Sequence, residues 1–165
     1  MVPMIVLGIA VVLMTAAAAV TDWRMHRIPN AITVPAAVAG LLYHGFFPTG
    51  EGWWFALGGF GVGFALLLLP WIFGGGGMGD VKLLAALGSW LGPFYVLIAF
   101  AVSAFVGSFL ALMTVFAGGL TAVKRETSAA EAEKTPKPRK ALPFAIPLAV
   151  GSWLVLAWLA LRGGF

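Results

Sequence analysis

Residues 53–73 have the sequence WWFALGGFGVGFALLLLPWIF, which contains no charged side chain. A run of about 20 apolar residues can cross the hydrocarbon core of a bilayer as a helix, which satisfies its own backbone hydrogen bonds. Of the 165 residues in the chain, 61% are hydrophobic and 10% are charged, against about 25% charged in an average soluble domain. So few charges cannot cover the exterior of a soluble domain of this length. The composition therefore excludes an ordinary soluble globule.

Five further apolar runs flank this stretch, with polar residues concentrated between them. The six runs lie at about 3–20, 31–47, 53–73, 81–92, 94–118 and 143–161. We therefore predict an all-α, polytopic integral membrane protein with six transmembrane helices, forming a single membrane-embedded domain over residues 1–165. The fourth run is shorter than the roughly 17 residues that a spanning helix needs. Gly92 and Pro93 separate it from the fifth run, and a single bent segment there stays an alternative.

Basic residues indicate how these helices are oriented. Arg24 and Arg27 follow the first run, Lys82 opens the fourth, and six more basic residues lie between the fifth and sixth runs. Cytoplasmic loops are rich in Lys and Arg, so with six spans these positions map to the cytoplasmic side. We attribute the net charge of +4 to this topology and expect no nucleic-acid partner. Residues 121–141 lack apolar periodicity and are predicted to form a cytoplasmic linker.

Some classes of site and of processing are disfavoured by what the sequence lacks. The chain has no cysteine, which excludes disulfides, thiolate metal sites and a cysteine nucleophile. We predict neither a metal nor a cofactor. The first run could be taken for a signal peptide, but no Lys or Arg precedes it, so we expect it to be retained.

Asp22 and Asp80 are the only aspartates in the chain, one just past the first run and the other just before the fourth. Ionisable residues beside membrane helices are costly, so both are candidates for function. Two carboxylates that approach closely do not both ionise easily, and such a pair can activate water and polarise a peptide carbonyl. An aspartic peptidase is one interpretation. Helix caps, which suit Asp80 in particular, and a proton-coupled transporter are the alternatives, although no run has an acid at its middle.

The residues around each aspartate favour a substrate site. Gly77 and Gly79 end a glycine-rich segment, 74–79, which has little side-chain bulk and can bend around a peptide. Pro29 and Asn30 are predicted to end the connection after the first run and to start the next helix.

Other residues receive structural predictions. Lys82 lies about 200° around a helix from Asp80, so we expect it to point away, toward headgroups or acidic groups of a substrate. His44 lies near the outer end of the second run and is predicted to be a membrane-interface residue. Gly59 and Gly63 have the spacing of residues at close helix contacts.

Two motifs carry a specific resemblance. Gly77-Met78-Gly79-Asp80, continued by Val81-Lys82-Leu83, resembles the GxGD motif of type IV prepilin peptidases, which are membrane aspartic proteases. Asp22, followed after five residues by Ile28-Pro29-Asn30, resembles the first motif of that family. Pro143-Phe144 is similar to the element that opens the family's last helix, although many members have glycine where this chain has Ala145. The resemblance covers nearly the whole chain.

The resemblance implies which residues form the site. It makes Asp22 and Asp80 the catalytic dyad. The residues that it implies for shaping the site or binding substrate are Gly77, Gly79, Lys82, Pro29, Asn30, Pro143 and Phe144.

The resemblance also implies an activity and a location. It predicts an aspartic endopeptidase of the bacterial inner membrane that removes the leader peptide of prepilins or pseudopilins at the cytoplasmic face, after a glycine that precedes the hydrophobic pilin helix. Larger members carry paired cysteines in an insertion linked to N-methylation of the pilin. A chain without cysteine is similar to the short, peptidase-only form associated with tight-adherence (Flp-type) pili. Its partners would be the prepilin and the lipid bilayer; an assembly subunit that binds pilins without cutting them stays an alternative.

Overall fold

The computed structural model of the protein describes residues 2–25, 27–47, 50–73, 77–122 and 145–162. These residues form five helices: α1 Val2–Met25, α2 Asn30–Phe46, α3 Trp53–Ile72, α4 Met78–Ala122 and α5 Ala145–Leu161. The all-α prediction is confirmed. Among the described residues, three stretches are long and apolar enough to cross a membrane, namely Ile5–Met25, Trp53–Ile72 and Met78–Met113. These helices identify a membrane protein, while the number of six crossings remains a prediction.

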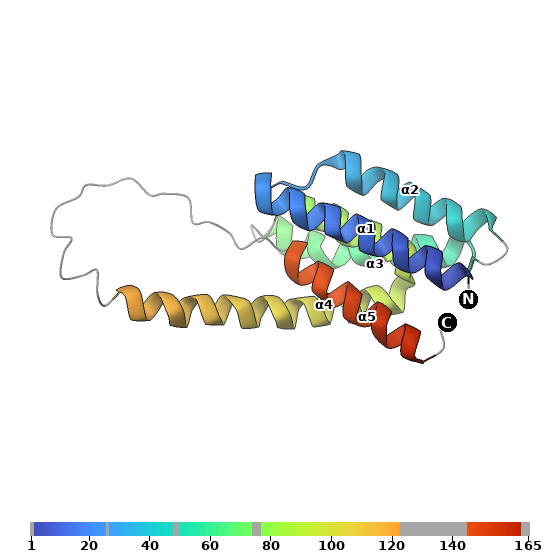
Figure 1. Ribbon diagram of the computed structural model, residues 1–165. Helices are drawn as coiled ribbons and strands as arrows, with labels where there is room; N and C mark the ends of the chain where they lie inside the picture. Colours follow the sequence, from blue (N-terminus) through green and yellow to red (C-terminus); the bar gives the residue numbers. More distant parts are fainter. Residues whose placement is uncertain (1, 26, 48–49, 74–76, 123–144, 163–165) are drawn as a thin grey trace.

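Helix α4 consists of two helical segments that meet at Gly92. This residue has φ 74° and ψ 176°, a backbone conformation that glycine adopts without steric cost, and Pro93 after it has no N–H with which to continue the helix. The second segment, residues 93–122, runs back toward the end of the bundle where the first segment, residues 78–91, begins (Figure 1). Consistent with this reversal, Gly107 lies beside Pro147 near the start of α5. The predicted break between the fourth and fifth runs is confirmed.

The first segment of α4 forms the centre of the bundle. Its fully buried side chains include Leu83, Leu84, Leu87 and Leu91. Residues 83–91 carry no charged side chain on any face, so other helices can surround this segment on all sides. It therefore acts as the core against which α2 and α3 pack, while α5 contacts the second segment at Ala99, Ser103 and Gly107.

Helix α3 crosses this central segment at a pair of glycines. A Cβ built on Gly59 would overlap the carbonyl oxygen of Gly88, and one built on Gly88 would overlap that of Gly59. A Cβ on Gly63 would likewise meet the carbonyl oxygen of Leu84. The two backbones thus touch with no side chain between them, which confirms the contact predicted from the spacing of Gly59 and Gly63.

Different helix ends meet at the two ends of the bundle. Figure 1 shows the last turn of α1 and the first turns of α2, α4 and α5 at one end, whereas α1 begins and α5 finishes at the other. We call the first of these the motif end, since it holds Asp22, Asn30, Asp80 and Ala145. Helix α4 extends past it as far as Ala122. Residues 121 and 122 are therefore helical and not part of the predicted linker, whose remainder lies outside the described residues.

His44 is not the membrane-interface residue that its position predicts. Its side chain is only 4% exposed, at the end of the bundle opposite the motif end. Its Nε2 lies 3.1 Å from the carbonyl oxygen of Trp90, and the backbone N–H of Glu51 donates to its Nδ1 at 3.2 Å. A carbonyl only accepts and an N–H only donates, so the neutral ring with its proton on Nε2 satisfies both. His44 thus caps the carbonyl of Trp90 near the break at Gly92, where backbone carbonyls lose the N–H partners that a continuous helix would provide.

Replacing His44 with alanine should lower the free energy of unfolding by about 2–4 kcal/mol, because the buried Trp90 carbonyl and the partly buried Glu51 N–H lose their partner. The measurement is denaturant or thermal unfolding in a fixed detergent. Ser89→Ala is the control, since the Ser89 hydroxyl bonds within its own helix to the Ala86 carbonyl and its loss should cost less than about 1 kcal/mol. Equal stability of the two variants would contradict the capping role of His44.

Candidate active site

Asp22 lies in the last turn of α1 and is 8% exposed. Its Oδ2 accepts a hydrogen bond from the backbone N–H of Ala145 at 3.3 Å. Ala145 begins α5, and the first N–H groups of a helix have no partner inside it and carry the positive end of the helix dipole. The carboxylate of Asp22 is therefore held and oriented by the start of α5.

Asp80 lies in the first turn of α4. Its backbone N–H donates to the carbonyl oxygen of Gly77 at 3.1 Å, and its carboxylate accepts a hydrogen bond from the backbone N–H of Gly77. Because α4 begins at Met78, Asp80 is the third residue of the helix and not the N-cap that its residue type suggests, and it stabilises the helix start from within the first turn. A Cβ on Gly77 would lie 3.3 Å from Oδ2 of Asp80, and glycine at this position leaves that space open.

The two aspartates lie near one another at the motif end. Asp22 acts electrostatically on the carboxylate of Asp80, and Asp22 is buried while Asp80 is half-buried. Placing two acids together in such surroundings weakens a fold, and it is typical of carboxylates that share a chemical task. Stabilising the helix start therefore does not by itself account for Asp80, because that role needs no second acid beside it.

Contacts between α2 and α4 join the two sequence motifs. Lys82 Nζ donates a hydrogen bond to Asn30 Oδ1 at 3.0 Å. A Cβ on Gly79 would lie 3.2 Å from the Cβ of Ile28, so the small size of Gly79 lets Ile28 pack closely against the start of α4. The sequence predicts that Lys82 points toward headgroups or substrate, and the structure adds a partner in the other motif. The predicted helix start is also confirmed, since Pro29 is the N-cap of α2.

Separating Asn30 from Lys82 should weaken the contact between α2 and α4. We expect Asn30→Ala and Lys82→Met each to lower the free energy of unfolding by about 0.5–1 kcal/mol, and the double variant to lose no more than the less stable single variant, because both substitutions remove the same contact. The measurement is a double-mutant cycle on unfolding in a fixed detergent, with a coupling energy of about 0.5–1 kcal/mol expected for a partly exposed hydrogen bond. Additive losses would show that the two side chains act separately.

Some predicted site residues lie outside the described residues, and some contacts were not predicted. Pro143 and Phe144 fall outside them, so their roles remain predictions. Ala145 acts through its main chain, so no side-chain signal in the sequence points to it. Ile28 was not predicted to lie in the site, although its position inside the first motif was a usable signal. Among the described residues, no group of three or more His, Cys, Asp or Glu is placed to hold a metal.

Known proteins resemble this chain over the same region. The type IV leader peptidase family matches residues 9–112, a stretch that contains both aspartates. The prepilin leader peptidase/N-methyltransferase of Aeromonas hydrophila is 32% identical over 146 residues, and that of Xanthomonas campestris pv. campestris is 32% identical over 147 residues. Each match covers 83% of this chain and 44% of the relative, so the chain spans less than half the length of these relatives.

No solved structure matches the chain, and its assignment therefore rests on sequence. The family match includes Asp22, Asn30, Asp80 and Lys82, the residues that the fold gathers at the motif end. Together with the match over more than half of the chain, this makes the protein a member of the type IV leader peptidase family.

Proposed function

We propose that the protein is an aspartic endopeptidase that removes the leader peptide of type IV prepilins or pseudopilins. The observation that carries the proposal is that Asp22 and Asp80 lie at the motif end, close enough for the charge of Asp22 to act on the carboxylate of Asp80. The curated relatives are named prepilin leader peptidases, which supports the substrate class. Within this class we propose a tight-adherence (Flp-type) prepilin as the substrate.

The proposed mechanism uses the two carboxylates on one water molecule. One carboxylate takes a proton from water as the water oxygen attacks the scissile carbonyl carbon, while the protonated partner donates a hydrogen bond to the carbonyl oxygen. The tetrahedral intermediate then collapses, the C–N bond breaks, and the leaving nitrogen receives a proton from the dyad. The protein's part is orientation: the backbone N–H groups of Ala145 and Gly77 each hold one of the carboxylates, so neither must be ordered during the reaction.

The cytoplasmic face of the inner membrane is the proposed location of this chemistry. Arg24, Arg27 and Lys82 all lie close in sequence to the residues of the motif end. An excess of basic residues is typical of the cytoplasmic side of a bacterial membrane protein. The leader would then be cut before the substrate leaves the cytoplasmic leaflet.

Co-expression with a tight-adherence prepilin tests the proposal. Leader removal should appear as a gel shift, and mass spectrometry should find a product that begins after a glycine. Purified protein should retain its activity in excess chelator, because a carboxylate dyad needs no metal. An uncut prepilin would refute the proposed function. Activity lost on chelation and restored by a divalent metal would refute the dyad mechanism.

A further inference from the structure

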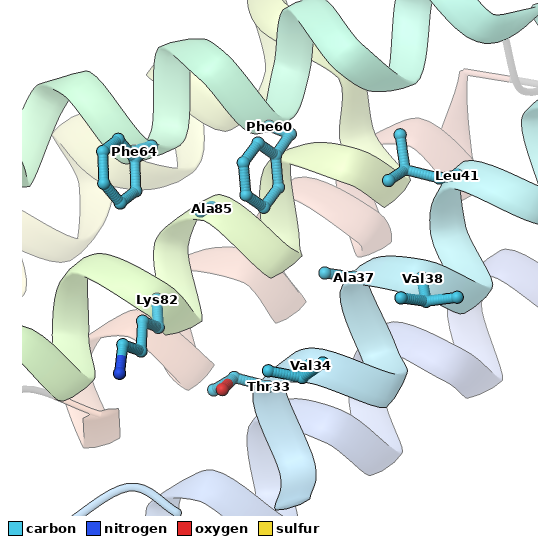
Figure 2. Close-up of a pocket in the computed structure, with 9 residues that line it drawn as sticks. All are labelled: Thr33, Val34, Ala37, Val38, Leu41, Phe60, Phe64, Lys82 and Ala85. Carbon is cyan, nitrogen blue, oxygen red and sulfur yellow. The ribbon is translucent and has the colours of Figure 1, made fainter. Parts of the chain in front are cut away.

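An apolar groove of about 290 Å³ lies between α2, α3 and the first segment of α4 (Figure 2). Phe60 and Phe64 of α3 form one wall, and Val34 and Val38 of α2 form the other. The two valines are exposed, so the groove is open to the surroundings of the bundle. Its volume is at the lower limit of ligand pockets, roughly 300–1,000 Å³. It can thus admit a few side chains from one face of a helix, but not a large ligand.

Small residues line the groove between these walls. Thr33 and Ala37 are four residues apart on α2 and therefore on the same face, and Ala85 of α4 lies opposite them. Small residues at such spacing let a further helix approach closely in a membrane. An acyl chain has no need of this spacing, whereas a helical segment uses it directly.

Thr33 is a polar group that lacks its ordinary partner. Its side chain is 2% exposed, and its hydroxyl has no hydrogen-bond partner in the described part of the chain. A threonine within a helix usually bonds to a carbonyl of the preceding turn, as Thr15 does to Val11 at 2.7 Å. A buried hydroxyl without a partner weakens the fold, and Thr33 lines the groove together with Lys82.

The groove leads to the motif end. Lys82 of α4 lines the groove. It lies near Thr33, at the start of α2, and far from Leu41, which lies toward the other end of that helix (Figure 2). Asp80 precedes Lys82 by two residues, or about 3 Å along the helix axis, so this end of the groove and the carboxylate lie at nearly the same depth. A chain that leaves the groove past Lys82 needs only a few extended residues to pass around the start of α4 to the dyad.

We propose that this groove receives the apolar helical segment of the substrate that follows the cleaved bond, and so positions that bond at Asp22 and Asp80. The inference rests on the proposed function, because it assigns the groove to the substrate of that site. Apolar burial along the walls would supply affinity. The small residues Thr33, Ala37 and Ala85 would set the depth of the segment in the membrane and hence which bond reaches the dyad.

A groove-filling variant tests this inference with two substrates. One is a whole prepilin with its apolar segment, and the other is a short peptide that spans the cleaved bond and stops before that segment. Val38→Trp fills the groove, and the matched control is Val150→Trp on α5, because Val38 is 47% and Val150 37% exposed and only Val38 lines the groove. The measurement is the ratio of kcat/KM for the whole prepilin to that for the short peptide.

We expect Val38→Trp to lower this ratio about tenfold through a higher KM for the whole prepilin, and Val150→Trp to leave the wild-type ratio unchanged. A photoreactive residue at Val34 in a protein carrying Asp80→Asn should also cross-link to the apolar segment of the prepilin. An unchanged ratio, an equal loss on both substrates, or a loss that depends on the lipids of the nanodisc and not on the substrate would each overturn the inference. Wild-type protein that cuts neither substrate would refute the proposed function instead.

Discussion

Asp80→Asn is expected to lower kcat/KM for leader cleavage by at least about 10³-fold, and Asp22→Asn should do the same. Asparagine keeps the size and shape of aspartate but cannot exchange a proton, and removing one general acid or base costs about 10²–10⁴ in rate. The two residues act on one water molecule, so the double variant should be little worse than either single one. The measurement is product formation by purified protein with excess prepilin.

The control for this experiment is Glu51→Gln, the same acid-to-amide change. Glu51 is exposed and lies next to the cap of His44, away from the motif end, so its substitution should leave the rate within about twofold. All variants must be present in the membrane at wild-type levels. Cleavage that survives either aspartate substitution would refute the dyad and favour a protein that binds prepilins or moves protons.

Gly59→Ala is expected to lower the free energy of unfolding by about 3 kcal/mol, the upper part of the usual range for overpacking. A Cβ at this position overlaps the carbonyl oxygen of Gly88, which belongs to the backbone of the central segment and cannot turn aside as a side chain does. The two helices must therefore move apart along the whole α3 and α4 contact. Reversible unfolding in mixed detergent micelles, followed by circular dichroism, measures the loss.

Gly61→Ala is the matched control on the same helix. A Cβ there meets nothing within 4 Å, so only helix propensity acts, and the change should be neutral or stabilise by up to about 1 kcal/mol. The sign of the effect should thus reverse between two glycines two residues apart. Equal effects at both positions would mean that the glycine contact does not limit how closely α3 and α4 pack.

The local features of the fold were predictable from the sequence. The break at Gly92 follows from glycine's freedom at positive φ and from the missing N–H of Pro93. The start of α2 at Asn30 follows from the proline before it. The contact at Gly59 and Gly63 follows from their spacing. Helix ends were less well predicted, since Asp22 and Asp80 lie inside the terminal turns of α1 and α4 and not beyond them.

The helical class, the membrane setting and the identity of the two candidate acids follow from the sequence alone, because run length, apolar content and motif order are properties of neighbouring residues. The surroundings of those acids depend instead on how the helices pack. The N–H of Ala145 reaches Asp22 across 123 positions of the chain, and Lys82 reaches Asn30 across 52. Every residue but proline has a backbone N–H, so no sequence pattern distinguishes the one that will bind a carboxylate. The packing of α1, α2, α4 and α5 at the motif end selects it.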